Sequence, residues 1–270
     1  MSGHETDFSG DIPRHYDQGM GPVVFAGYAA DMAHRAVTGG SPSRVLETAA
    51  GTGIVTRALR DALPAGVHLT ATDLNPAMLD VARAKFSAGE DATFQPADAM
   101  ALPFPDASFD TVICQFGVMF YPDKDKGHRE ARRVLTANGR YLFSVWDAHR
   151  HNPFARITHQ VVSGFFPDNP PRFFEVPCGY HAIDPIKDSL QAAGFGEITI
   201  SVSRQHRPVD CASFARGMIF GSPVFDQIRQ RGGVRPSEVQ DAVAAAMARE
   251  FGGEIGSMSL QAIVFEARTL

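Results

Sequence analysis

Small and acidic residues stand where a predicted strand turns into a helix, in the run Glu47-Thr48-Ala49-Ala50-Gly51-Thr52-Gly53. The apolar strand expected over 44–48 leads into this tight turn, and apolar residues recur at helical spacing over 53–63. A turn of this kind lets backbone amides and a helix N-terminus approach a ligand that a Cβ atom would push away. The run therefore predicts a site for a nucleotide-like ligand.

Asp73 follows the next predicted strand and lies 20 residues after Gly53. A carboxylate in this position can accept hydrogen bonds from both hydroxyls of a ribose. Asn75 is suited to cap the following helix, expected over 76–87, and Pro76 is suited to be its first residue. Taken alone, Asp73 could equally be an acid that stabilises the positive end of that helix.

Two further strand ends carry polar side chains. Asp98 stands in Pro96-Ala97-Asp98-Ala99-Met100, after a strand expected over 92–95, and its short carboxylate could accept from an exocyclic amino group. Gln115-Phe116-Gly117 closes a strand expected over 111–115. The carboxyl ends of parallel strands converge on one crevice, where ligands bind. All these residues are therefore expected at the same edge of one sheet.

Strands alternate with helices through the first half of the chain, which predicts an α/β fold with a parallel sheet covered on both faces. A helix is expected over 21–37, after a loose arm of residues 1–11, and another over 124–134. The later expected elements are a strand at 140–146, a helix over 183–193 that stops at Gly194, a strand around 198–202, a helix from Ser237 with a capping box to Gln240, and a final strand at 260–267.

Two stretches, 147–182 and 206–257, interrupt the alternation and are longer than ordinary connections. We expect them to form a cap together with the N-terminal residues, and to enclose a substrate. The expected division is 1–40 as arm and helical cap, 41–146 as cofactor-binding core, 147–182 as a cap insertion, 183–205 as continued core, 206–257 as a second cap insertion and 258–270 as the final core strand.

The composition is that of an ordinary globular chain, with 270 residues, 44% apolar and 20% charged. A net charge of −5 predicts neither a nucleic-acid surface nor a basic membrane-binding surface. Three widely spaced cysteines indicate a reducing compartment rather than a disulfide framework. The sequence has no signal-peptide pattern and no run of about 18 apolar residues, so a cytoplasmic protein without a membrane span is expected.

The order of the strand-end motifs resembles the class I S-adenosylmethionine-dependent methyltransferases, in particular small-molecule enzymes similar to the ubiquinone and menaquinone methyltransferases. The resemblance covers residues 15–146 and, less closely, the final strand. It implies a Rossmann-like seven-stranded sheet with helices on both faces, whose last strand is antiparallel and inserted near the edge. It also implies S-adenosyl-L-methionine as the cofactor and S-adenosyl-L-homocysteine as the product.

By this resemblance the glycine loop cradles the methionine part of the cofactor, Asp73 binds the ribose, and Asp98 reads the adenine amino edge. Tyr16 would help to close the site, where the face of its ring favours a sulfonium cation. The family usually has glycine where Ala49 stands, so the methionine carboxylate could be held differently. The full expected cofactor set is Tyr16, Glu47, Ala49, Gly51, Gly53, Asp73, Leu74, Met78, Ala97, Asp98, Ala99, Gln115 and Phe116.

The acceptor site is less clearly marked. Its expected lining residues are Phe25, Phe120, Tyr121 and Trp146, although each could instead belong to the core. His149 is a weak candidate for a general base, because an imidazole titrates near working pH, and a solvated loop histidine is the favoured interpretation. No metal is expected. The expected partner is a small apolar or aromatic methyl acceptor with an O, N or C nucleophile, and a homodimer is one option for assembly.

Two other functions fit parts of the pattern. A nicotinamide-dependent oxidoreductase shares the glycine loop and the strand-end acid, but Thr56 stands where the third glycine of its G-x-G-x-x-G fingerprint would fall. A non-catalytic relative would bind the cofactor through the same residues without turnover. Binding of S-adenosylmethionine and NAD(P) separates the first two functions, and a turnover assay separates the third.

Overall fold

The computed structural model describes residue 8 and residues 10–269, which divide into two compact units. One, called here the sheet unit, contains Tyr28–Val145, Tyr180–Ser203 and the residues from Ala262 onward. The other, called the helical unit, contains the residues up to Gly27 together with Trp146–Gly179 and Arg204–Gln261. Each unit is therefore assembled from segments that lie far apart in the sequence.

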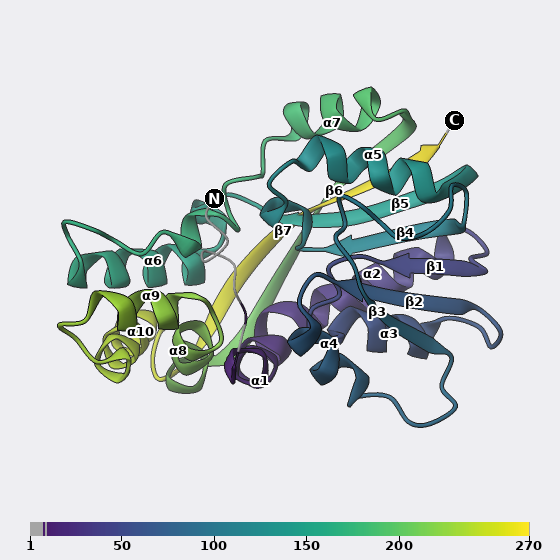
Figure 1. Ribbon diagram of the computed structural model, residues 1–270. Helices are drawn as coiled ribbons and strands as arrows, with labels where there is room; N and C mark the ends of the chain where they lie inside the picture. The colour runs from purple at the N-terminus through teal and green to yellow at the C-terminus, as the bar shows by residue number, and fades with distance from the viewer. Residues whose placement is uncertain (1–7, 9, 270) are drawn as a thin grey trace. The chain divides into compact units, whose positions relative to one another are not determined.

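Seven strands of the described chain form one mixed sheet in the order β3-β2-β1-β4-β5-β7-β6 (Figure 1). Their bounds are β1 Arg44–Glu47, β2 His68–Asp73, β3 Ala92–Pro96, β4 Phe109–Gln115, β5 Leu135–Trp146, β6 Phe195–Asp210 and β7 Ile255–Thr269. β1 pairs in parallel with β2 and β4, β3 with β2, and β5 with β4. The predicted Rossmann-like sheet is confirmed, and its last strand is inserted between β5 and β6.

Helices cover both faces of the sheet in the sheet unit. They are α2 Ala26–Thr38, α3 Ile54–Ala62, α4 Pro76–Arg83, α5 Lys124–Val134 and α7 Ile183–Ala192. Figure 1 shows α2, α3 and α4 on one face and α5 and α7 on the other. On the first face, Leu69 and Leu142 share a buried core with α2 and α3. On the other, the rings of Tyr141 and Phe143 lie 5.8 and 5.3 Å from the ring of His128 on α5. Residues 141–143 of β5 thus alternate between the two faces, as a doubly covered strand requires.

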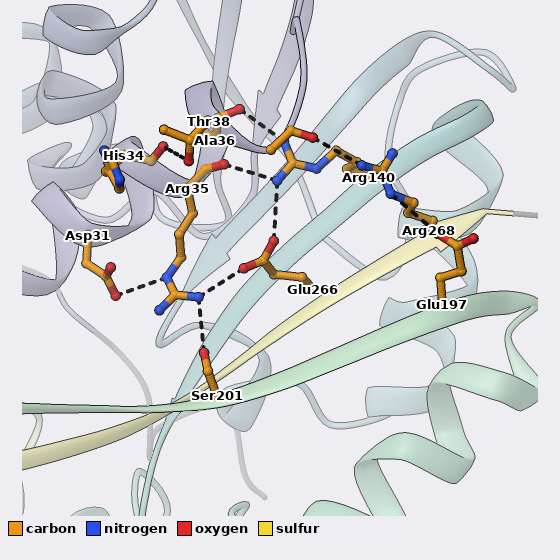
Figure 2. A network of polar contacts seen from close by, with 11 residues as sticks. Asp31, His34, Arg35, Ala36, Thr38, Arg140, Glu197, Ser201, Glu266 and Arg268 are labelled. Atoms are coloured by element: carbon orange, nitrogen blue, oxygen red, sulfur yellow. Dashed lines mark hydrogen bonds and ion pairs between the residues drawn. The ribbon is translucent and has the colours of Figure 1, made fainter.

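Charged residues tie α2 to strands β5, β6 and β7, as Figure 2 shows. Arg35 donates to Glu266 Oε1 on β7 at 2.9 Å and to Ser201 Oγ on β6 at 3.0 Å. Arg140 on β5 donates to the carbonyl oxygens of Arg35 and Ala36, both at 3.0 Å, and lies 3.4 Å from Glu266 Oε2. The carboxylate of Glu266 therefore lies between two guanidinium groups, and Arg35 also pairs with Asp31 at 3.1 Å.

Replacing Glu266 by glutamine is expected to lower the free energy of unfolding by about 1–3 kcal/mol, because Arg140 loses its carboxylate partner and Arg35 keeps only Asp31, at 3.1 Å, as a carboxylate partner among the described residues. Glu197→Gln is the matched control, since its partner Arg268 lies 3.7 Å away and Glu197 is 76% exposed. That variant is expected to cost less than about 0.5 kcal/mol in the same urea titration. Equal costs for the two variants would show that the Arg35–Glu266–Arg140 cluster adds no stability.

The helical unit holds α1 Ile12–His15, a π-helix Tyr16–Phe25, α6 Pro153–Phe165, α8 Cys211–Phe220, α9 Val224–Arg231 and α10 Pro236–Phe251. α10 packs against α6 and α8, and the π-helix packs against α8. In the latter contact the two backbones approach closely: a Cβ atom on Gly19 would lie 2.5 Å from the Cα of Gly217. Among the described residues, no helix combines the length and the apolar character that crossing a membrane requires.

The helix predicted over 21–37 is wrong in its first part. The structure has a π-helix up to Phe25, which then continues as α2. Pro22 lies inside the π-helix, and a proline there lacks an amide hydrogen and crowds the preceding turn of an ordinary α-helix. A wider turn accommodates this residue, so apolar spacing alone could not define the helix type.

Other element bounds also differ from the prediction. The stretch 147–182, which has no clear periodicity in sequence, contains the 13-residue helix α6 starting at Pro153. α4 ends at Arg83 instead of residue 87. The capping box expected at Ser237 is wrong, because α10 starts at Pro236 and Glu238 accepts from Arg235 N at 3.4 Å and Arg235 Nε at 2.7 Å. With Pro236 at the first helical position, the capping box lies two residues closer to the N-terminus than predicted.

Candidate cofactor site

The loop between β1 and α3 is built from left-handed backbone conformations. Ala49, Gly51 and Gly53 have φ values of +52°, +55° and +77°. The amide of Ala50 donates to Thr72 O at 2.9 Å, which ties the loop to the end of β2. A Cβ atom on Gly53 would lie 2.7 Å from the Cβ of Ala82 on α4, so only glycine allows α3 and α4 to approach this closely. The predicted turn is thus a rigid loop at the start of α3.

Asp73 joins this loop to the following helix. Its Oδ2 accepts from Gly51 N at 2.8 Å and its Oδ1 accepts from Asn75 N at 2.8 Å. Burial raises the pKa of this carboxyl, while the two amide donors act in the opposite direction. Asn75 in turn accepts from Ala77 N at 2.9 Å, which confirms it as the N-cap of α4. Each carboxylate oxygen has a second lone pair that could accept from a ligand hydroxyl.

Glu47 lies at the carboxyl end of β1 and is only 1% exposed. Its Oε2 is buried and has no hydrogen-bond partner among the described residues, and the same holds for the hydroxyl of Thr52 in the loop. Burial raises the pKa of Glu47 to about 8; the nearby charge of Asp73 also raises it, and the Thr56 hydroxyl partly offsets the shift. Glu47 thus places a buried acid, whose Oε2 has no partner among the described residues, beside a loop of amide donors. Such an arrangement is suited to bind a charged ligand.

The ends of β2 and β3 carry the residues expected around an adenine. Asp73 pairs in register with Pro96, which brings Asp98 to the same edge of the sheet. Asp98 Oδ1 accepts from Met100 N at 2.8 Å, and Ala97 N donates to Asp73 O at 2.9 Å. Leu74 is an apolar side chain that is 74% exposed directly after Asp73. An exposed leucine beside two carboxylates is suited to cover the face of a flat base.

Met78 and Ala99 complete this group. Met78 is buried on α4, and its Cε lies 3.9 Å from the position that a Cβ atom on Gly51 would take. Ala99 follows Asp98 in the turn between β3 and the bridge residue Ala101. The structure therefore gathers the predicted residues of the first three strand ends at one edge of the sheet unit, although their contacts with a cofactor stay a prediction.

The end of β4 has a second strained turn. Phe116 has a φ of +54°, and its amide donates to Ser144 O at 3.0 Å at the end of β5. Its buried ring meets the ring of Tyr28 edge to face, with centroids 5.4 Å apart. Gln115 precedes it as the last residue of the strand. Tyr28 lies on α2, and no sequence signal identifies it as the support of Phe116.

Three predicted aromatic residues lie together in the helical unit. The rings of Tyr16 and Phe25 are stacked, with centroids 5.0 Å apart and an interplanar angle of 19°. Phe25 lies 6.2 Å from Trp146, and Trp146 meets Phe154 edge to face at 5.4 Å. The π-helix aligns the first two rings, because nine residues of an α-helix would rotate them to opposite faces. Their roles in closing the site and lining the acceptor stay predictions.

The remaining candidates have defined partners in the structure. His149 Nε2 donates to the carbonyl oxygen of Phe174 at 2.9 Å, so Nδ1 is its proton-accepting atom when neutral. The hydroxyl of Tyr121 is buried and lies 3.3 Å from both Thr48 Oγ1 and Cys114 Sγ. Phe120 lies in the short 3-10 helix Val118–Phe120 directly before it. The phenol of Tyr121 therefore serves the packing of the β1 and β4 ends, whatever its ring contributes to an acceptor.

Part of the sheet unit matches a known protein family. Residues 45–139 match the family described as methyltransferase domain. The demethylmenaquinone methyltransferase of Deinococcus radiodurans is 45% identical over 103 residues, which are 38% of this chain and 42% of that protein. The ubiquinone/menaquinone biosynthesis C-methyltransferase of Hahella chejuensis is 40% identical over 122 residues, 44% of this chain and 46% of that protein. The chain thus spans less than half of the length of these relatives.

Solved structures share the fold over most of the chain. Phosphoethanolamine N-methyltransferase 2 of Haemonchus contortus, in complex with S-adenosyl-L-methionine, has a TM-score of 0.62 at 15% identity and covers 95% of this chain and 56% of that one. The YcgJ protein of Bacillus subtilis has a TM-score of 0.58 at 20% identity and covers 90% and 98%. Residues 45–139 therefore match a methyltransferase domain, and the strand order and the solved structures show the fold that this domain shares with them.

Proposed function

We propose that this protein transfers a methyl group from S-adenosylmethionine to a small aromatic, quinone-like acceptor. The observation that carries the proposal is the edge formed by Glu47, the loop 49–53 and Asp73. It combines amide donors, a buried acid whose Oε2 has no partner among the described residues, and a carboxylate fixed by two amides. The methyltransferase-domain match covers all of these residues.

The side chains at this edge fit the chemical parts of the cofactor. Asp73 is suited to bind the ribose hydroxyls, and Leu74 with Asp98 is suited to bind the adenine ring and its amino group. The ionised form of Glu47 would compensate the cationic methionine end. Bound S-adenosylmethionine supplies a methyl group already activated on sulfonium sulfur. The protein then has to orient the acceptor and exclude water, which needs no nucleophile or metal of its own.

The acceptor is proposed from two observations. One curated relative is named for demethylmenaquinone, and another is named as a C-methyltransferase of ubiquinone and menaquinone biosynthesis. The helical unit of this chain holds the stacked pair Tyr16–Phe25 beside Trp146, and aromatic rings of this kind favour flat apolar ligands. A quinone-like ring that is methylated at carbon fits both better than a charged or macromolecular acceptor does.

The dinucleotide alternative is disfavoured by Thr56. This residue is fully buried inside α3, at the place where the third glycine of the fingerprint would permit close packing of helix and strand. The non-catalytic alternative differs from the proposal only in turnover.

Calorimetry with S-adenosylmethionine, S-adenosylhomocysteine and NAD(P)H tests the cofactor first. We expect micromolar binding of the first two and none of the third. Turnover is then measured as release of S-adenosylhomocysteine. The acceptors are reduced demethylmenaquinone and, for comparison, a phenol and an amine of similar size. Binding of NAD(P)H alone would overturn the proposal, and cofactor binding without turnover of any acceptor would favour the non-catalytic relative.

A further inference from the structure

Ala49 adopts a backbone conformation that glycine would adopt at lower cost. Its φ is +52°, in the left-handed region where a Cβ atom crowds the following carbonyl oxygen. An L-residue there costs on the order of 1 kcal/mol relative to glycine. Strained residues of this kind persist where the surrounding structure over-determines them, often at functional sites. The contacts of the Ala49 methyl group are therefore expected to explain why alanine stands at this position.

The methyl group lies over Gly117, the residue that follows the strained turn at the end of β4. A Cβ atom added to Gly117 would lie 2.5 Å from the Cβ of Ala49 and 2.7 Å from Cys114 Sγ. Both distances are much shorter than a van der Waals contact. The methyl group of Ala49 therefore occupies space that is open only because residue 117 is glycine. Gly117 itself has an ordinary φ of −101°, so its backbone conformation does not require glycine. Glycine is required there because a side chain would collide with Ala49 and Cys114.

Hydrogen bonds also join the ends of β1 and β4. Thr48 N donates to Ile113 O at 2.9 Å, from the β1 end to β4. The Tyr121 hydroxyl lies 3.3 Å from Thr48 Oγ1 and 3.3 Å from Cys114 Sγ, within a buried layer. The contact of the Ala49 methyl group with Gly117 links the same two strand ends, and it is made by a residue of the loop 49–53 itself.

We propose that Ala49 is a positioning residue, whose methyl group, seated on Gly117, fixes the cofactor loop 49–53 against the end of β4. This inference rests on the proposed function and on the expectation that the loop 49–53 holds the methionine part of the cofactor, with Gln115 and Phe116 in the same site. A fixed spacing between the two strand ends places the donor relative to the acceptor before either binds. The strain at Ala49 is then offset by a loop that needs no ordering when the cofactor arrives.

Ala49→Gly separates positioning from stability. The variant loses the methyl contact but also loses the backbone strain, so its melting temperature without ligand is expected to stay within about 2 °C of the parent or to rise. Affinity for S-adenosylhomocysteine is expected to fall roughly three- to tenfold, the size that ordering one flexible loop costs. In the ligand-free protein, amide hydrogen exchange at residues 50–53 is expected to quicken by a similar factor. If Ala49 served stability alone, Ala49→Gly would lower the melting temperature and leave the affinity unchanged.

Ala107→Gly is the matched control. Ala107 is an exposed residue with a φ of +54°, in the turn before β4, and its amide donates to Arg133 O at 3.0 Å. The same substitution relieves the same backbone strain there without touching the loop 49–53. We expect it to leave both cofactor affinity and exchange at residues 50–53 unchanged.

Gly117→Ala and the double variant complete the test. The added methyl collides with Ala49 and Cys114, so Gly117→Ala is expected to weaken S-adenosylhomocysteine binding by more than tenfold. Adding Ala49→Gly removes the 2.5 Å conflict, and the double variant is expected to bind more tightly than Gly117→Ala alone. An Ala49→Gly variant with parental affinity and parental exchange at residues 50–53 overturns the inference.

The exchange measurement keeps this inference distinct from the proposed function. If the parent protein binds neither S-adenosylmethionine nor S-adenosylhomocysteine, the proposed function fails, and exchange at residues 50–53 in the ligand-free variants still decides whether Ala49 fixes the loop. Faster exchange in Ala49→Gly but not in Ala107→Gly supports the contact; equal exchange in both rejects it.

Discussion

Replacing Asp73 by asparagine is expected to weaken the binding of S-adenosylmethionine about 30- to 100-fold. The carboxylate accepts from the amides of Gly51 and Asn75, one on each oxygen. An asparagine amide has one acceptor oxygen and must turn its NH₂ group towards one of these donors, which leaves a buried N–H unsatisfied. The variant also loses the charge-assisted bonds to ribose hydroxyls. Calorimetric titration with S-adenosylmethionine and S-adenosylhomocysteine measures the loss, and Asp73→Ala is expected to be at least as severe.

Asp80→Asn is the control for this prediction. Asp80 lies on α4, about one turn after its first residue. It is 74% exposed and pairs with Arg83 at 2.8 Å. It carries the same charge near the same helix but has no part in the loop. We expect its affinity to stay within about twofold of the parent, since an exposed pair of this kind contributes little. Equal affinity in the parent and in Asp73→Asn would remove Asp73 from the cofactor site.

Replacing Glu47 by glutamine is expected to abolish a pH dependence of stability between pH 6 and 8. Burial raises the pKa of Glu47 to about 8 in the folded protein, whereas the usual value is 4.5. Between these values the folded state holds a proton that the unfolded state has released. The free energy of unfolding therefore falls as pH rises through this range, by about 2 kcal/mol from pH 6 to pH 8. Glutamine does not titrate, so urea titrations at pH 6, 7 and 8 should show the parent losing that much relative to the variant.

Glu90→Gln is the control with the opposite sign. The amide of Ser87 and the guanidinium of Arg57 hold the pKa of Glu90 below its usual value. Its contribution is complete above pH 4.5, so the difference between this variant and the parent should be flat from pH 6 to 8. Cofactor affinity gives a second readout: it should rise with pH in the parent, because the ionised acid pairs with the cationic ligand, and stay flat in Glu47→Gln. A parallel pH response of parent and Glu47→Gln would contradict the assigned protonation state.

The positions of the polar residues at strand ends could be predicted because they follow from a few local rules. The alternation of strands with helices indicates β1 to β4, and each of the polar groups then follows directly after a predicted strand. Asn75 and Pro76 marked the start of α4 by their chemistry alone, and the structure has both in those roles. Gly194 likewise ends α7 with a φ of +91°.

The parts that could not be predicted depend on tertiary contacts. Nothing in the residue type of Ala49 or Phe116 indicates a positive φ, because each is held there by neighbours on other strands. The unpaired Oε2 of Glu47 follows from its burial at the end of β1, which sequence does not reveal. The π-helix depends on Pro22 and on the glycine contacts with α8, so it escaped a prediction based on apolar spacing.

The place of β7 in the sheet has a consequence for how the protein is made. β7 is the last strand along the described chain, yet it lies between β5 and β6, and β6 is the edge strand beyond it. While the chain grows on a ribosome, β6 has no neighbour in the sheet until Ile255–Thr269 has been synthesised. Until then β5 presents an open edge of 12 residues and β6 is an unattached segment of 16 residues. The nascent protein should therefore be most prone to mispairing, and most dependent on chaperones, in the interval between these two strands.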